Sequence, residues 1–145
     1  MSNEKFERLE EAEGAMDWRV EPGRYALAGF SDSPTAEDLL LIGATGQLIR
    51  EGGETTLLVA TSQVPRLLEL HSRVVLEEDL VWFRFEGTMD WQLVGFLALV
   101  TGKLAEAGIP IGAICGFSRD HLFIAERFLE GSRKVLEGLF GPELR

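Results

Sequence analysis

The chain has 145 residues, of which 46% are hydrophobic and 26% charged, and its formal net charge is -10. This composition is typical of a globular protein, and the negative charge disfavours binding to nucleic-acid backbones or anionic membranes. No run of about 20 apolar residues could span a membrane, and the N-terminus lacks the basic and apolar segments of a signal peptide. The single cysteine excludes an intramolecular disulfide. We therefore expect a cytoplasmic protein.

Residues 1–20 are interpreted as an N-terminal extension. Residues 1–14 are rich in glutamate and contain Phe6 and Leu9, a pattern that predicts a short surface helix. The first module is placed after this segment.

The next part of the chain predicts a strand, a helix, a hairpin and a second helix. These elements are a strand at 24–30, a helix that begins at 33–38 and continues through 39–42, strands at 47–51 and 54–60, and a helix at 64–70. Gly52 and Gly53 favour a tight hairpin, because glycine readily adopts positive φ, and Pro65 suits a first helical turn. An alternative reading makes residues 46–51 the end of a helix. The hairpin is preferred, because it aligns residues 57–60 with residues 122–125 of the second half.

The second half of the chain repeats this order with stronger signals. Its elements are a strand at 80–86, a turn at 87–90, a helix at 91–107, strands at 109–118 and 121–126, and a helix at 128–140. Alternating apolar residues mark the first strand, and apolar residues at spacings of three and four mark the first helix. Gly108 is placed to end that helix, and Arg119-Asp120 is read as a two-residue hairpin turn.

Over residues 78–140 this half resembles the ACT domain, a βαββαβ module that senses ligands. The residues that carry the resemblance are Trp82-Phe83-Arg84-Phe85-Glu86-Gly87, Leu93-Val94-Gly95, Leu104-Ala105-Glu106-Ala107-Gly108-Ile109 and Cys115-Gly116-Phe117-Ser118-Arg119-Asp120-His121-Leu122-Phe123-Ile124. In this order they look like the small tandem-ACT proteins that are related to aspartokinase regulatory domains and to cytosolic arginine sensors.

The resemblance implies an α+β fold of two ferredoxin-like modules, each with an antiparallel sheet and helices on one face. The first, degenerate module is assigned to residues 21–76 and the second to residues 77–145. The second module lacks a final strand after its last helix, so a sheet edge is left to be covered. We expect that another chain covers it in a homodimer, or that the other half of this chain supplies the strand.

The resemblance also places a ligand between the modules, against the loop at the start of the first helix. The N-terminus of that helix has free backbone N–H groups, which suit the carboxylate of an amino acid. The candidate ligand-binding residues are Thr88, Met89, Asp90, Val94, Gly95, Cys115, Gly116, Phe117, Ser118 and Asp120 in the second module, and Ser31 and Asp32 in the first.

Several of these residues also have an ordinary structural explanation. Asp90 is expected to cap the helix, with a role as acceptor of the ligand's ammonium group as the other possibility. Asp120 could bind a ligand or only shape the hairpin turn, and Ser31 and Asp32 are better explained as helix-starting residues. Ser118 departs from the family pattern, which argues against a basic amino acid as ligand.

Three tryptophans also have an open role: they could line a pocket or complete a core, and the sequence does not separate these cases. They are Trp18, Trp82 and Trp91.

An enzyme is not expected. Cys115 and His121 suggest a thiol–imidazole dyad, but a two-residue turn pairs Ser118 with His121 and Cys115 with Ile124, which puts the two side chains on opposite faces of the sheet. His71 has no cysteine or spaced carboxylates nearby in the sequence, so we predict no metal site and no cofactor. The sequence thus favours a non-catalytic regulatory protein that senses an amino acid. A ligand-free oligomerisation module is the alternative, a small thiol hydrolase has least support, and the regulated partner is not identified.

Overall fold

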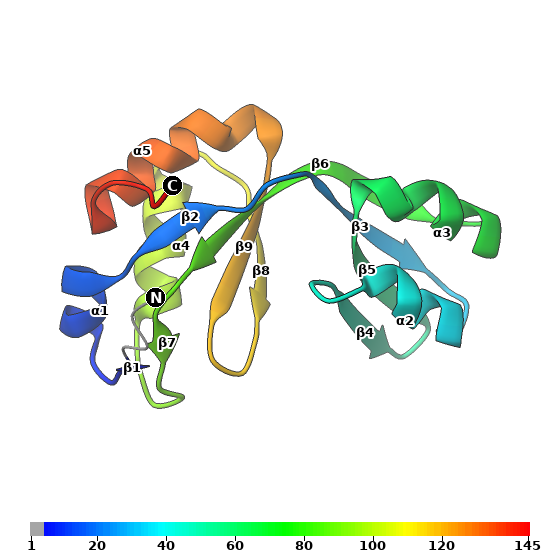
Figure 1. Ribbon diagram of the computed structural model, residues 1–145, viewed down its shortest axis with the longest axis horizontal. Helices are drawn as coiled ribbons and strands as arrows, with labels where there is room; N and C mark the ends of the chain where they lie inside the picture. The colour runs from blue at the N-terminus through cyan, green and yellow to red at the C-terminus, as the bar shows by residue number, and fades with distance from the viewer. Residues whose placement is uncertain (1–4) are drawn as a thin grey trace. The chain divides into compact units, whose positions relative to one another are not determined.

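The computed structural model describes residues 5–145, which form two compact units (Figure 1). Unit 1 joins the described residues up to Pro22 to the segment Val81–Arg145, and unit 2 comprises Gly23–Leu80. Each unit is an antiparallel sheet with helices, so the predicted α+β class is confirmed. No helix within residues 5–145 is both long and apolar enough to cross a bilayer.

Unit 2 has the predicted order of elements. They are β3 (Tyr25–Phe30), α2 (Ala36–Ile42), β4 (Gln47–Glu51), β5 (Glu54–Ala60), the 3-10 turn η1 (Thr61–Gln63), α3 (Val64–Leu70) and the first part of β6 (Val75–Phe85). The strands lie in the order β4-β5-β3-β6, and every neighbouring pair is antiparallel. Residues 47–51 are a strand, and Glu51 pairs with Glu54 around Gly52, which has a φ of 45°. The hairpin prediction is therefore confirmed.

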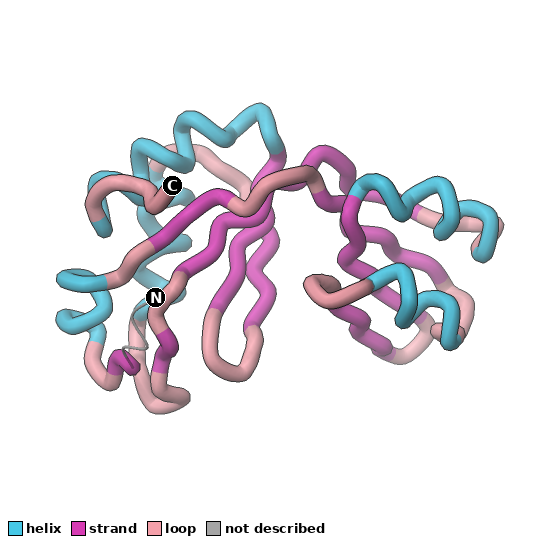
Figure 2. The backbone as a smooth tube through the Cα atoms, in the orientation of Figure 1, coloured by secondary structure: helices cyan, strands magenta, loops and turns pink. Residues whose placement is uncertain are grey.

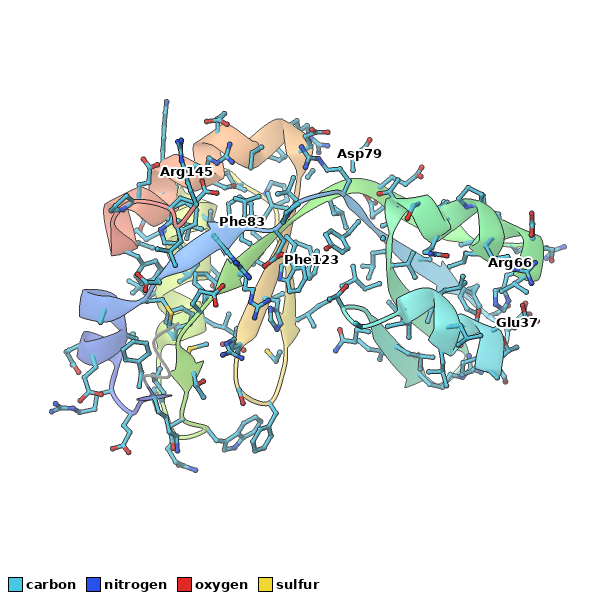
Figure 3. All side chains as sticks on the ribbon, in the orientation of Figure 1. Glu37, Arg66, Asp79, Phe83, Phe123 and Arg145 are labelled. Carbon is cyan, nitrogen blue, oxygen red and sulfur yellow. The ribbon has the colours of Figure 1, made fainter. Side chains whose placement is uncertain are left out.

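Helices α2 and α3 pack against one face of the unit 2 sheet (Figure 1). Alternate residues of β3 and β5 point to these helices, as the period of a strand requires. The buried side chains are Ala26, Ala28, Phe30, Leu41, Leu57, Val59, Val64 and Leu67. On the surface, Glu37 of α2 faces Arg66 of α3 and forms an ion pair with it (Figure 3).

Gly46 lets the chain pass close to the neighbouring strand where α2 leads into β4. A Cβ atom at this position would lie 2.5 Å from the backbone oxygen of Leu58, which cannot move without disturbing the sheet. Gly46→Ala is therefore expected to lower the free energy of unfolding by about 2 kcal/mol. In the same hairpin a Cβ atom on Gly53 meets open space, so Gly53→Ala should change stability by less than about 0.5 kcal/mol. Urea unfolding compares the two, and equal effects would contradict the packing argument.

Unit 1 is built from both ends of the chain. Its elements are β1 (Lys5–Phe6), α1 (Leu9–Ala15), β2 (Trp18–Val20), the end of β6, β7 (Thr88–Met89), α4 (Phe96–Glu106), β8 (Gly112–Cys115), β9 (Asp120–Ala125), the 3-10 turn η2 (Glu126–Phe128) and α5 (Leu129–Phe140). The sheet runs in the order β2-β6-β9-β8, while β1 pairs with β7 in a parallel two-stranded ladder. Helices α4 and α5 lie side by side on the sheet (Figure 1).

The segment expected to be an extension supplies the missing strand of this sheet. Trp18 pairs with Phe85 and Val20 with Phe83, so β2 occupies the edge that the second module was expected to leave open. Trp18 is fully buried, and its indole Nε1 donates to the carbonyl oxygen of Gly141 at 2.9 Å. Residues 5–20 are therefore part of the fold of unit 1, and of the two expected sources of the strand it is the chain itself that provides it.

The core of unit 1 contains side chains from the sheet and from α1, α4 and α5. Its buried members are Phe6, Ala12, Met16, Trp18, Val81, Phe83, Phe85, Met89, Phe96, Val100, Leu104, Ile109, Leu122, Ile124 and Leu136. Phe83 on β6 and Phe123 on β9 are labelled in Figure 3; Phe123 is buried as well but is not part of this cluster.

Strand β6 begins at Val75, five residues earlier than the sequence predicts, and it contains a bulge. Tyr25 pairs with Leu80 and Leu27 with Glu77, so two residues of β6 oppose one of β3. Asp79, labelled in Figure 3, adopts a φ of 54° there, a conformation that aspartate tolerates better than most residues.

Candidate functional site

The loop between β7 and α4 differs from its prediction. Helix α4 begins at Phe96 and not at Trp91, and Gly95, with a φ of 98°, occupies the N-cap position. Asp90 closes a turn instead: its Oδ1 accepts a hydrogen bond from the backbone N–H of Gln92 at 2.8 Å, and its carbonyl oxygen accepts one from Leu93. The prediction that Asp90 caps the helix is wrong, because five residues separate Asp90 from Phe96, the first residue of α4.

The N-terminus of α4 therefore has no side-chain cap. The first intrahelical hydrogen bond runs from the backbone N–H of Leu99 to the carbonyl oxygen of Gly95. The N–H groups of Phe96, Leu97 and Ala98 consequently have no acceptor within the helix, and they carry the positive end of its dipole. An exposed anion or carboxylate is the natural partner of such a group.

The hairpin that faces this loop also differs in register. Cys115 pairs with Asp120 and Ile114 with His121, so four residues, 116–119, form the turn, and the predicted two-residue turn is wrong. The N–H of Gly116 donates to the carbonyl oxygen of Arg119 at 2.8 Å, and a Cβ atom on Gly116 would lie 3.0 Å from that oxygen. The absence of a side chain at Gly116 thus permits the hydrogen bond that closes the four-residue turn, and Asp120 lies in β9 and not in the turn.

The new register still separates Cys115 from His121. Since Ile114 is the partner of His121, the neighbouring Cys115 points to the other face of the sheet. His121 instead accepts a hydrogen bond from the indole N–H of Trp82 at 3.2 Å. A thiol–imidazole dyad between these two residues is therefore not formed.

The β7–α4 loop, the first turn of α4 and the β8–β9 turn line an open cavity of about 280 Å³ within unit 1. Its lining residues are Met89, Asp90, Trp91, Leu93, Gly95, Phe96, Leu97, Ala98, Cys115, Gly116, Phe117, Ser118, Arg119 and Asp120. The two loops, drawn pink in Figure 2, are tied together by a hydrogen bond from the N–H of Met89 to the carbonyl oxygen of Ser118 at 2.9 Å.

The structure brings eight of the twelve predicted site residues to this cavity. They are Met89, Asp90, Gly95, Cys115, Gly116, Phe117, Ser118 and Asp120. Thr88 and Val94 flank the cavity in sequence without lining it, and Ser31 and Asp32 belong to unit 2. Sequence reasoning missed Arg119, which it assigned to the turn, and the first turn of α4, because it placed the start of that helix too early.

The charged side chains around the cavity differ in the partners that they already have. Lys5 Nζ lies 2.7 Å from Asp90 Oδ2, and this ion pair, together with the N–H of Gln92, holds the pKa of Asp90 below its usual range. Arg119 donates from its Nε to the carbonyl oxygen of Glu86, and within residues 5–145 no partner of its terminal nitrogens is found. Burial and the nearby Asp120 carboxylate raise the pKa of the Cys115 thiol, so the thiol stays protonated at neutral pH. Among the residues that line the cavity, the charged groups outside the Lys5–Asp90 ion pair are thus the Arg119 guanidinium and the Asp120 carboxylate, which accepts a hydrogen bond from the Cys115 thiol.

The corresponding loop of unit 2 is closed by its own side chains. Thr35 caps α2, because its Oγ1 accepts from the N–H of Asp38 while Asp38 Oδ2 accepts from the N–H of Thr35 at 2.8 Å. The carbonyl oxygens of Ser31 and Asp32 both accept hydrogen bonds from Arg50 Nη1. Ser31 and Asp32 therefore hold the loop through their carbonyl oxygens, and neither caps α2, where Thr35 is the N-cap residue. Unlike α4, helix α2 has a side-chain acceptor for one of its first N–H groups, that of Asp38.

Unit 2 also contains a partly buried ionic cluster that sequence analysis missed. His71 lies between two carboxylates, with Nδ1 3.0 Å from Asp32 Oδ2 and Nε2 2.8 Å from Asp38 Oδ1, and its ring stacks on Phe30. Burial favours the neutral ring, but hydrogen bonds and charges from the two carboxylates outweigh it and raise the pKa of His71. Among residues 5–145, no group of histidine, cysteine, aspartate and glutamate side chains is arranged to hold a metal ion.

Comparisons with known proteins agree with this architecture. Residues 75–138 match the family model of the ACT domain. A crystal structure of an Agobacterium tumefaciens protein is 21% identical, covers 90% of this chain and 92% of its own, and has a TM-score of 0.72. The regulatory subunit of aspartate kinase from Thermus thermophilus is 13% identical over 85% of this chain and 96% of its own, with a TM-score of 0.65. No curated protein matches the sequence.

At these identities the solved structures show a shared fold, while the family match identifies the domain itself. ACT domains are generally regulatory modules that bind small molecules, often amino acids. Residues 75–138 of this protein, which include the loop and hairpin around the cavity, are an ACT domain.

Proposed function

We propose that the protein is a non-catalytic regulator that binds an amino acid in the cavity of unit 1. The observation that carries the proposal is the uncapped N-terminus of α4, which borders the cavity next to Arg119 and Asp120. A site that combines helix N–H groups without an intrahelical acceptor, a guanidinium and a carboxylate is complementary to a small zwitterion.

In the proposed complex the ligand's carboxylate accepts hydrogen bonds from the N–H groups of Phe96, Leu97 and Ala98. Arg119 contributes a second positive charge, and Asp120 accepts the ammonium group. Asp90 takes no direct part, because Lys5 and Gln92 already engage both of its oxygens. The other predicted residues at the cavity form its walls, among them Met89, Gly95, Cys115 and Ser118.

The absence of catalysis is part of the same proposal. Cys115 is the only cysteine of the chain, its thiol has a raised pKa, and His121 points to the other sheet face. A cysteine nucleophile needs a lowered pKa, usually from a neighbouring imidazole or positive charge, whereas the neighbour of Cys115 is the Asp120 carboxylate, which holds the proton on the thiol.

We further propose that the protein acts as a homodimer that changes its association with a regulated protein when the ligand binds. Strands β4 and β8 are the terminal strands of their sheets, and such strands offer free backbone groups for pairing. Multi-angle light scattering with and without ligand measures the oligomeric state. A ligand-free assembly module remains the competing function, and it predicts a dimer that no amino acid stabilises.

A thermal-unfolding screen against the common amino acids tests the binding proposal. A ligand that binds only the native state at about 100 times its Kd should stabilise the protein by about 2.7 kcal/mol. Asp120→Asn and Arg119→Gln should each weaken this stabilisation, because each removes a charge that pairs with the zwitterion.

Matched controls are available in the same unit. Asp17→Asn and Arg127→Gln make the same chemical changes at exposed positions away from the cavity, and both should retain the full ligand response. A flat response to all amino acids, or an equal loss in the control variants, would contradict the proposal.

A further inference from the structure

We infer that the ligand carries an apolar side chain and that Trp91 and Phe117 close over it. This inference rests on the proposed function and names the class of amino acid that the cavity selects. It follows from the position of two exposed aromatic side chains, from the way in which their loops are connected, and from the charges that remain free after the zwitterion is bound.

Trp91 and Phe117 expose far more apolar surface than a folded chain ordinarily leaves in water. Trp91 is 80% and Phe117 93% exposed, and among the exposed large apolar side chains of residues 5–145 they are the only aromatic ones. Both line the same cavity. Burial of an aromatic ring is strongly favourable, so two unburied rings at one cavity indicate a partner that covers them.

The two rings come from the two loops that border the cavity. Trp91 lies two residues after Met89, and Phe117 lies one residue before Ser118, and the Met89–Ser118 hydrogen bond ties the bases of the two loops together. The rings therefore extend from a fixed bridge, while the segments that carry them are turns outside regular elements (Figure 2). Rotation about side-chain bonds is enough to bring both rings onto a bound ligand, without any change in the sheet.

The inner surface of the cavity also favours an apolar group, because its walls are apolar. Its side walls are formed by Met89, Leu93, Phe96 and Leu97. Once Arg119 and the α4 N-terminus hold the carboxylate and Asp120 holds the ammonium group, the remaining charged group is Asp90, which Lys5 neutralises. A charged ligand side chain would lose water without gaining a counter-ion, whereas an aliphatic or aromatic one would fill the space between the rings.

Intrinsic fluorescence provides a direct test, because Trp91 is the one exposed tryptophan. Trp18 is fully buried and Trp82 is 7% exposed, so a ligand that covers Trp91 should shift the emission maximum to shorter wavelength. Free leucine, methionine and phenylalanine should bind at least about tenfold more tightly than alanine, which presents the same zwitterion without a large side chain. Lysine and glutamate should bind no better than alanine.

The variants separate the rings from the zwitterion site. Trp91→Ala and Phe117→Ala, followed by isothermal titration calorimetry, should each weaken leucine binding about tenfold and leave alanine binding unchanged. Leu40→Ala removes an equally exposed apolar side chain from α2 of unit 2 and should change neither affinity.

The outcomes distinguish this inference from the proposed function. Equal affinities for alanine, leucine and lysine would overturn the apolar selectivity while leaving a zwitterion site intact. No binding of any amino acid would remove both. An emission shift that depends on protein concentration and not on ligand would show that the rings are covered by a second chain, and would also overturn the inference.

Discussion

Trp18→Ala is expected to lower the free energy of unfolding by about 3–5 kcal/mol, the range for deleting a large buried aromatic side chain. The indole lies fully buried in the core of unit 1, where its ring stacks on Phe83, and its Nε1 donates to the carbonyl oxygen of Gly141. The variant therefore loses a strand anchor, a hydrogen bond and the packing between the first and last parts of the chain. Urea unfolding followed by far-UV circular dichroism measures the loss.

Trp91→Ala is the matched control, because it makes the same chemical change at a position that is 80% exposed. Its effect on stability should stay within about 0.5 kcal/mol. If residues 5–20 were an extension that does not belong to the core, Trp18→Ala would be equally mild. That outcome would contradict the place of β2 in the sheet of unit 1.

The role of Trp18 illustrates which parts of the fold the sequence predicts. Hairpin β4–β5 is local: Gly52 and Gly53 lie between two alternating runs, and the predicted strands agree with the observed ones. Strand β2 has only three residues, and its partner Phe85 lies far along the chain. A period of two needs more residues than that to be recognised, and nothing in the sequence reveals pairing over such a distance.

The sequence predicts which loops carry the candidate residues but not the geometry of those residues, for a related reason. The two loops that form the cavity follow from the βαββαβ order, so most of their residues were identified. The roles of individual residues depend on local geometry that residue type does not determine. Asp90 is a good N-cap residue by type, yet it forms a turn five residues before the helix, and Asp120 is a good turn residue that lies in β9.

The ionic cluster of unit 2 escaped prediction altogether. His71 is far in sequence from both Asp32 and Asp38, and aspartate at the start of a helix already has a sufficient explanation as a capping residue. The close contact is produced by the packing of α3 against α2, which brings the end of one helix to the start of the other.

Breaking this cluster is expected to destabilise the protein in a pH-dependent way. Asp38→Asn should lower the free energy of unfolding by about 3 kcal/mol near pH 6, because it leaves the buried imidazolium with one carboxylate in place of two. Asp38 is fully buried; burial favours its protonated form, but the N–H of Thr35 and the His71 ring outweigh it and lower the pKa of Asp38. At pH values above the raised pKa of His71, where the ring is neutral, the difference from the wild type should shrink.

The direction of this dependence follows from the two pKa shifts. The pKa of His71 is raised above its ordinary value of 6.5, so its contribution to stability is complete below that value and is lost as the pH rises through the higher, folded pKa. The pKa of Asp38 is lowered below 3.8, so its contribution is complete above that value and is lost only at lower pH. The cluster therefore stabilises the protein most strongly between these two ordinary values.

The other histidine provides a control with the opposite sign. Burial and the Arg84 guanidinium lower the pKa of His121, so its environment makes the protein less stable as the pH falls below about 6.5. The chain has only two histidines. The free energy of unfolding, measured between about pH 5.5 and 8.5, should thus rise with pH in the lower part of this range and fall in the upper part. His71→Gln should abolish the loss of stability at high pH, and His121→Gln should abolish the loss of stability below about pH 6.5. Identical slopes in both variants would mean that the Asp32–His71–Asp38 cluster is not charged in the folded protein.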